Sequence, residues 1–246
     1  MIETLSPYLS WNECDFQTFF TILISIGYFT IYWFIFKSEK IKNYFYKKYE
    51  FDKAAARHIL FTKYAGFVLM GLIPTILALI FLPHISLADY GLAFNTQTWL
   101  TSLLWIAGIS IVIVPVSMMS AKKPKNLENY PQIRSKVWTK KLMLHNALGW
   151  TFYLFGYEFL FRGILFVPLV MSMGFWPATA VNIALYSATH KPKGIEETIG
   201  AAVLGLALCW LTALTGSIWI AFFVHVAMAL SNSFTALKHN PQMTIK

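Results

Sequence analysis

Long apolar segments alternate with short polar ones along nearly the whole chain. A helix needs about 20 mainly apolar residues to cross the hydrocarbon core of a bilayer. Seven segments meet or approach this length, at residues 16–36, 64–82, 99–119, 142–173, 176–190, 199–214 and 217–233. The stretch before Trp150 is either a cytoplasmic extension of the fourth helix or a further short membrane element. The pattern therefore predicts an all-α fold, a polytopic transmembrane helical bundle of about seven (seven to eight) spans.

The composition agrees with a membrane protein and excludes a soluble domain. Apolar residues make up 57% of the 246 positions and charged residues only 13%, whereas a soluble chain carries roughly 25% charged residues. Mean hydropathy is +0.55. A chain with so few charged side chains could not cover its surface with polar groups. The chain has only two cysteines, Cys14 and Cys209, which are far apart in the sequence, so no disulfide framework is expected.

The net charge of +9 is sorted by position along the chain. Nineteen of the twenty Lys and Arg side chains lie outside the spans on one predicted face. Eight are in residues 37–63, seven in residues 122–141, two in the loop after the fifth span (Lys191 and Lys193) and two in the tail (Lys238 and Lys246). Residues 83–98, on the opposite face, hold none. The positive-inside rule therefore predicts an amino terminus outside and a carboxyl terminus in the cytoplasm. No basic stripe is left over, so no nucleic-acid partner is expected.

One basic and one acidic residue fall inside the predicted spans, and both lie in the sequence YEFLFRG. They are Arg162 and Glu158. An ionisable group in hydrocarbon costs several kcal/mol and is a functional candidate by default. The i, i+4 spacing puts both on one face of a helix, with the acid toward the amino end. Taken alone, the two residues are equally well explained as a structural ion pair.

Further polar residues extend this set. His190 closes the fifth span in YSATH, with Tyr186 and Asn182 on about the same helix face. His225 lies inside the seventh span in HVAMALSN, with Asn232 two turns further on. A single membrane histidine is more often a helix–helix hydrogen bond than a catalyst. Two histidines, a carboxylate and an arginine from three spans are harder to explain by packing alone.

Counting residues from the turns indicates the depth of these side chains. Glu158 precedes the turn at Gly174 by 16 residues and His190 follows it by 16. At about 1.5 Å of rise per residue, the two are expected at similar depth, nearer the cytoplasmic side. His225 lies only eight residues past Ser217. It is therefore expected to lie at a different depth unless the preceding loop dips inward.

This combination suits the hydrolysis of an amide by an activated water. A partly desolvated carboxylate can act as general base, and a histidine can polarise a carbonyl or stabilise an oxyanion. The catalytic candidates are Glu158, His190, His225, Arg162 and Asn232. Two histidines and a glutamate also match a common catalytic zinc set, with Glu158, His190 and His225 as ligands. Because no HExxH spacing is present, no cofactor is favoured and zinc stays an alternative.

These residues resemble a known family, the CAAX prenyl protease and bacteriocin-immunity (Abi, CPBP) family of intramembrane endopeptidases. The family pattern is EExxxR on one helix, FxxxH on the next, and a histidine followed by Asn or Asp on a later helix. The matching stretches are YEFLFRG, YSATH and HVAMALSN, in the same order, within residues 157–232. The resemblance divides one membrane domain into an N-terminal part with three spans, 1–141, and a protease-like core, 142–246.

The resemblance implies a hydrolase that cuts a membrane-associated peptide or protein, CAAX-type prenylated proteins included, with a Glu/His-activated water. Glu158 and Arg162 correspond to the family's second glutamate and its arginine. His190 corresponds to the histidine that pairs with the activating carboxylate, and His225 to the later histidine on the oxyanion side. The resemblance also implies a multi-pass protein of the bacterial plasma membrane, whose partners are the lipid bilayer and the substrate.

Two positions depart from the family pattern. Tyr157 stands where the family has its first glutamate, the usual water-activating base. Ala229 stands where Asn or Asp follows the later histidine by four residues, and Asn232 is the nearest substitute. These departures leave an alternative open: a catalytically inactive membrane scaffold, or a bacteriocin-immunity or regulatory protein of the same fold. A transporter is a third hypothesis, which the lack of paired repeats disfavours.

Overall fold

Each predicted span is a helical rod in the computed structural model, which describes residues 9–191 and 194–246. In chain order the rods are α1 (Glu13–Lys37), α3–η2–α4 (Phe51–Gly66, Phe67–Leu72 and Ile73–Phe81), α5 (Trp99–Ala121), α7–η4–α8 (Lys140–Glu158, Phe159–Phe166 and Val167–Met173), α9 (Phe175–Ala188), α10 (Ile195–Thr215) and α11 (Trp219–His239). The η segments are π-helical. Lys193, one of the basic residues assigned to the cytoplasmic side, lies outside the described residues.

The predicted fold class is confirmed. Within the described part of the chain, six rods are long and apolar enough to cross a membrane. The seventh, α9, has 14 residues and so spans only about 21 Å. The stretch before Trp150 belongs to α7 and continues that rod without a break. The chain is therefore an all-α multi-pass membrane protein, whose described residues form seven rods.

Short elements connect the rods or follow the last one. The connecting elements are α2 (Glu39–Lys48), η3 (Ala88–Leu92), α6 (Pro124–Leu127) and β1 (Val137–Trp138), and β2 (Thr244–Ile245) lies in the carboxyl-terminal tail. The two strands pair in parallel, so the carboxyl-terminal tail is tied to the segment that leads into α7. This two-residue pairing leaves the all-α character of the fold unchanged.

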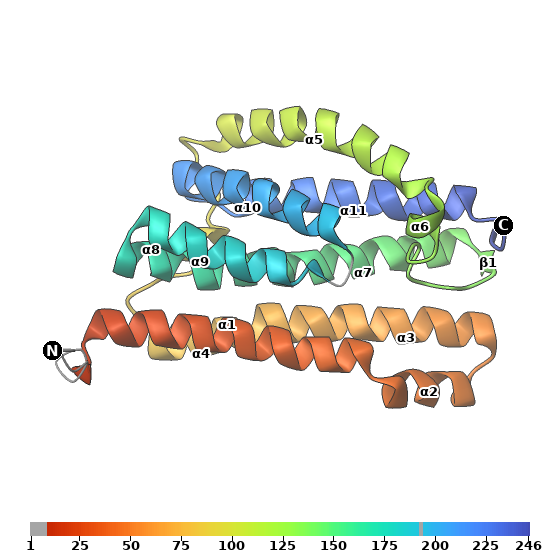
Figure 1. Ribbon diagram of the computed structural model, residues 1–246, viewed down its shortest axis with the longest axis horizontal. Helices are drawn as coiled ribbons and strands as arrows, with labels where there is room; N and C mark the ends of the chain where they lie inside the picture. Colours follow the sequence, from red (N-terminus) through yellow and green to blue (C-terminus); the bar gives the residue numbers. More distant parts are fainter. Residues whose placement is uncertain (1–8, 192–193) are drawn as a thin grey trace, which may run out of the picture.

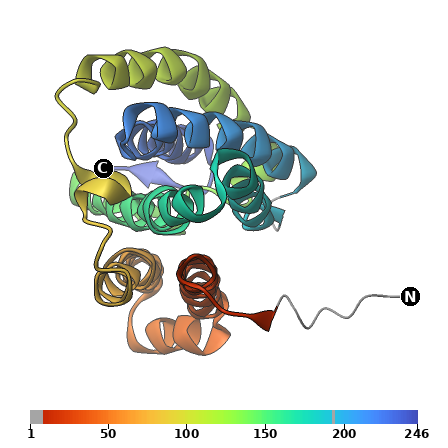
Figure 2. The same cartoon turned by 90° about the vertical axis from the view of Figure 1, so that its left-hand side faces the viewer.

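The rods lie in layers around the α7–η4–α8 rod (Figure 1). α1 and α3–η2–α4 cover one side of that rod, α9 lies beside the rod in the same layer, and α10 and α11 lie on the other side, with α5 outermost against α11. The view along the bundle in Figure 2 shows the same order. Of the most apolar window of each rod, 78% is buried in α7–η4–α8 but only 11% in α5. The central rod therefore carries its polar residues into the core of the protein, while most of α5 is left for contact with lipid.

Two glycines let the central rod approach its neighbour closely. A Cβ on Gly156 would lie 3.1 Å from backbone atoms of Phe67 and Gly71 on η2. Small residues at such crossings allow membrane helices to pack backbone to backbone. Gly156 precedes Glu158 by two residues, so this contact helps to place the start of the YEFLFRG sequence inside the bundle.

The segment between α4 and α5 folds back into the bundle. Tyr90 is fully buried there, and Gly91 adopts φ +83°, a conformation that favours glycine. The backbone N–H of Ile218 donates to the carbonyl oxygen of Gly91 at 3.1 Å, and Ile218 is itself fully buried. This contact holds the turn before α11 inside the protein.

α1 begins at the end of the bundle opposite the carboxyl terminus (Figure 1). Which end faces the cytoplasm stays a prediction from the distribution of Lys and Arg. The division into parts 1–141 and 142–246 also stays a prediction.

Candidate active site

The two ionisable residues of the central rod form a buried ion pair. Glu158 is the last residue of α7 and Arg162 lies in η4. Arg162 Nε lies 3.3 Å from Glu158 Oε2, and both side chains are 0% exposed. Removing two charges from water is costly, and their mutual attraction offsets that cost only while both are present. Each residue therefore depends on the other to remain charged in the core.

His225 from α11 completes this pair on the carboxylate side. Its Nδ1 lies 2.6 Å from Glu158 Oε1. An ionised carboxylate can only accept, so Nδ1 carries the proton and Nε2, on the opposite side of the ring, carries the lone pair of the neutral imidazole. His225 therefore reaches Glu158, contrary to the depth expected from its eight-residue distance past Ser217. The turn before α11 dips inward because Gly91 and Ile218 hold it there.

Side chains from α9 and α10 enclose the Arg162 guanidinium. Arg162 Nη1 donates to Asn182 Oδ1, and Cys209 Sγ lies 3.7 Å away. The ring of Tyr186 lies 4.3 Å from the guanidinium carbon, and its hydroxyl donates to Glu158 Oε1 at 3.4 Å. The sequence pattern placed Asn182 and Tyr186 on the His190 face, but nothing in it pointed to Cys209. These contacts fix the guanidinium, and through it the carboxylate.

His190 lies just past the end of α9 in a short chain of hydrogen bonds. Its Nδ1 lies 3.1 Å from the carbonyl oxygen of Tyr186. Because a carbonyl only accepts, Nδ1 carries the proton and the lone pair of the neutral ring is again on Nε2. Thr189 Oγ1 donates to the same carbonyl at 2.7 Å and therefore accepts from the Tyr157 hydroxyl, also at 2.7 Å. Thr189 was not among the residues expected from the sequence.

The Tyr157 ring lies close to both histidines. The ring centroids are 5.7 Å apart for Tyr157 and His225, and 6.5 Å apart for Tyr157 and His190. Tyr157 is 3% exposed. The position that holds the first glutamate of the family pattern is thus occupied by a phenol whose hydroxyl is already bonded to Thr189.

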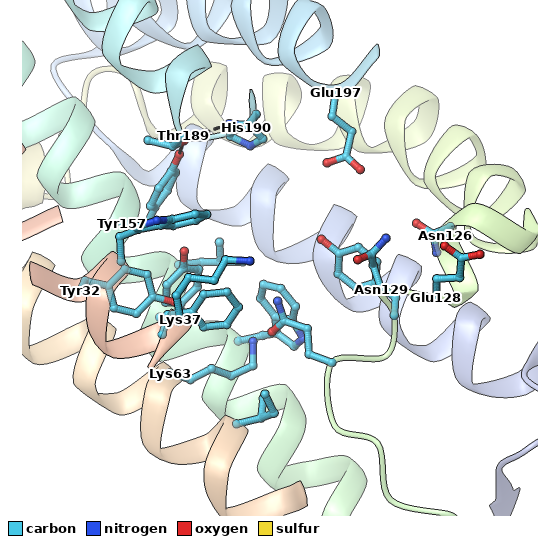
Figure 3. A pocket seen from close by; sticks show the side chains of 18 of the residues that line it. Tyr32, Lys37, Lys63, Asn126, Glu128, Asn129, Tyr157, Thr189, His190 and Glu197 are labelled. Atoms are coloured by element: carbon cyan, nitrogen blue, oxygen red, sulfur yellow. Dashed lines mark hydrogen bonds between the residues drawn. The ribbon is translucent and has the colours of Figure 1, made fainter. Parts of the chain in front are cut away.

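A cavity of about 590 Å³ leads to these residues. Tyr157, Thr189, His190 and His225 line one part of it, while Glu158 is not among the described lining residues. In Figure 3, Tyr157, Thr189 and His190 lie on one side of the pocket and Glu197, Asn126, Glu128 and Asn129 on the other. The ion pair therefore lies behind His225, and the two imidazoles face the cavity.

Charged side chains of both signs line the rest of this cavity. The acids are Glu39, Glu128, Glu196 and Glu197, and the basic residues are Lys37, Lys42, Lys63, Lys123, Lys125 and Arg134. Partial burial lowers the pKa of the Arg134 guanidinium from its ordinary value, but the group stays a cation at neutral pH. The cavity thus opens on the side of the protein that is rich in Lys and Arg.

Asn232 is not brought to the other candidates. It exchanges hydrogen bonds of 3.2 Å with the amide of Asn126 on α6. Two helical turns, about 10 Å, separate it from His225 along α11. Ala229 packs in an apolar cluster with Trp150 and Leu154. The structure therefore brings Glu158, Arg162 and His225 together. His190 lies on the other side of the Tyr157 ring, and Asn232 lies away from the group.

The arrangement does not fit a zinc site. Within the described residues, no three His, Cys, Asp or Glu side chains are grouped as metal ligands. A zinc ion needs lone pairs that converge on one point. His225 Nδ1 instead donates to Glu158 Oε1, and the positive guanidinium of Arg162 lies 3.3 Å from Glu158 Oε2.

Comparison with known proteins identifies one segment of the chain. The family model described as Rce1-like, type II CAAX prenyl endopeptidase, matches residues 139–231. The match includes Glu158, Arg162, His190 and His225 and ends one residue before Asn232. No curated protein and no solved structure matches the chain.

Proposed function

Through residues 139–231 the chain belongs to the Rce1-like family of CAAX proteases, and from this we propose that it is an intramembrane endopeptidase. Its substrate is a membrane-associated peptide or protein, and CAAX-type prenylated proteins are the first class to test. The observation that carries the proposal is the His225 imidazole, which lines the cavity and is backed by a buried carboxylate at 2.6 Å.

His225 is the general base. A water in the cavity gives a proton to Nε2 while its oxygen attacks the carbonyl carbon of the scissile peptide bond. The tetrahedral intermediate collapses when Nε2 returns this proton to the amide nitrogen, and the C–N bond breaks to give a carboxylic acid and an amine. Glu158 accepts from Nδ1–H throughout and stabilises the imidazolium between the two steps, the part that a buried acid has in hydrolase triads.

Glu158 and Arg162 are positioning residues in this scheme. The carboxylate touches the base and not the substrate, since it lies behind His225 and is 0% exposed. Arg162 holds the second carboxylate oxygen at 3.3 Å. His190, on the other side of the Tyr157 ring, is assigned to orient the water. With His225 as the base, activity does not require a glutamate at position 157, where this chain has a tyrosine.

Steady-state cleavage of quenched fluorescent peptides by the protein in lipid nanodiscs tests the proposal. His225→Gln should lower kcat by about 10²–10⁴-fold, the usual effect of losing a general base, with little change in KM. Glu158→Gln should also lower kcat, and Glu158→Asp should recover part of the loss. The matched control is His145→Gln, since His145 bonds only the Lys141 carbonyl among the contacts described. Undiminished cleavage by folded His225→Gln would refute the assignment.

A non-catalytic scaffold or immunity protein is the second candidate. The observation that favours it is Tyr157, a phenol in place of the family's first glutamate. It predicts no cleavage of any peptide by the intact protein. It also predicts that His225→Gln leaves the cellular phenotype unchanged wherever the variant accumulates to normal levels.

A further inference from the structure

A lysine is buried in the wall of the same cavity. Lys63 on α3 is only 2% exposed, although it lines the cavity. Its stem lies against Gly149, where a Cβ would come within 2.9 Å of Lys63 Cδ. Its ammonium lies 3.0 Å from the centre of the Trp150 ring and 5.4 Å from that of Tyr153. Aromatic faces attract a cation in this geometry, so the site is built around a positive charge.

The indole of Trp150 adds a second donor beside this charge. Trp150 lines the cavity and is 5% exposed, and its Nε1 has no hydrogen-bond partner among the described residues. Buried polar groups are nearly always satisfied, so an unpaired one points to a missing partner. An indole N–H can only donate, as can an ammonium. The missing partner is therefore an acceptor, and the lysine favours one that is negatively charged.

We propose that Lys63 and Trp150 bind the free terminal carboxylate of the peptide substrate. The inference rests on the proposed function, and it assigns a specificity role to Lys63, which lies outside the matched segment 139–231. A carboxylate has one negative charge and two oxygens, which suit one ammonium and one N–H. Aromatic side chains of the cavity wall, among them Phe29, Tyr32 and Phe36, leave apolar surroundings for the residues that precede the carboxylate.

A row of aromatic rings on α7 connects this anchor to the histidines. Trp150, Tyr153 and Tyr157 follow one another with ring centroids 6.0 Å apart at each step. Figure 3 shows Lys63 and His190 on opposite sides of Tyr157. The seven residues from Trp150 to Tyr157 cover about 10 Å along the helix. An extended peptide advances about 3.3–3.6 Å per residue, so a short extended segment of substrate covers this interval.

Binding of two peptide probes tests the anchor without any cleavage. The probes are one apolar hexapeptide with a fluorescein at its amino end, prepared as the free acid and as the carboxamide. Fluorescence polarisation gives Kd for each with the His225→Gln protein in nanodiscs, so that neither probe is cut. The free acid should bind about 10- to 100-fold more tightly, the range for a hydrogen bond to a charged group. Equal binding of the two probes would overturn the proposal, and this comparison needs no substitution at Lys63 or Trp150.

Variants locate the effect. Lys63→Met should abolish the preference for the acid, Lys63→Arg should keep part of it, and Trp150→Phe should reduce it while keeping an aromatic face. Lys37→Met is the matched control, since Lys37 is an exposed cation of the same cavity. A preference that persists in folded Lys63→Met, or that disappears equally in Lys37→Met, would overturn the assignment.

The outcomes separate the anchor from the protease proposal. If the protein cuts peptides, Lys63→Met should raise KM for the free acid and spread the cut over several positions, with kcat little changed. If the intact protein cuts nothing but still prefers the acid through Lys63, the anchor stands and the protease proposal fails. If it cuts acid and amide with the same KM, the protease proposal stands and the anchor fails.

Discussion

Replacing Glu158 by glutamine would leave the Arg162 guanidinium without the carboxylate that lies 3.3 Å from it. Glutamine is nearly the same size and can still accept from His225 Nδ1, but its amide nitrogen or a neutral oxygen would then face the guanidinium. Breaking one side of a fully buried ion pair costs about 3–5 kcal/mol. For a chain of this length that corresponds to a fall of about 6–20 °C in the temperature of unfolding.

The exposed pair of Glu39 and Lys42 provides the control. Its atoms are 3.2 Å apart, almost the same as in the buried pair, but the side chains are 71% and 46% exposed. Exposed pairs contribute only about 0–1 kcal/mol, so Glu39→Gln should shift unfolding very little. Thermal unfolding in one detergent, followed by size-exclusion chromatography of heated samples, compares the two variants at equal protein concentration.

A double variant tests the reason for the effect. Glu158→Gln combined with Arg162→Met removes both charges, and replacing a whole buried pair by neutral side chains is often close to neutral. The double variant should therefore be more stable than Glu158→Gln alone. Glu158→Gln as stable as Glu39→Gln would contradict the mutual dependence of the buried charges. So would a double variant whose loss of stability equals the sum of the losses from Glu158→Gln and Arg162→Met.

Two further changes test the packing and the topology. Gly163→Ala would place a methyl group 2.8 Å from the backbone oxygen of Tyr90 and should destabilise the fold by about 1–3 kcal/mol. Gly108→Ala, where no described atom lies within 4 Å, should be neutral in the same unfolding assay. A membrane-impermeant maleimide should label the exposed Cys14 from outside intact cells, and the buried Cys209 only after denaturation. Labelling of Cys14 only in inverted vesicles would reverse the predicted orientation.

Hydropathy locates the membrane-spanning part of each rod but not always its ends. The first predicted span, 16–36, became α1 (Glu13–Lys37), because a capping box at Asn12 and Asp15 starts the helix just before the apolar run. The second rod begins at Phe51, well before the predicted start at residue 64. Its first turns carry Asp52, Lys53 and Arg57, which are compatible with a helix but not with hydrocarbon. Hydropathy measures burial in lipid, and a helix can extend beyond the bilayer.

The candidate site is built from contacts within one helix, which the sequence predicts, and from contacts between distant segments, which it does not. The pairing of Glu158 with Arg162 follows from their spacing on one helix. The pairing of Glu158 with His225 depends on the inward turn at Gly91 and Ile218, which is a contact between distant segments. Asn232 shows the opposite case: helix periodicity puts it on the face of His225, but two turns further along the axis it lies against α6.

The sequence by itself determined that this chain lies in a membrane, approximately where each rod runs, and which two charges are buried together. These properties follow from the apolar content of local segments and from spacings along one helix. Only the tertiary structure decided that His225 bonds the Glu158 carboxylate, that the Tyr157 ring lies between His225 and His190, and that Lys63 lines the same cavity as these histidines. Each of these depends on the packing of rods far apart in the chain, and the periodicity of a single helix contains no information about its neighbour.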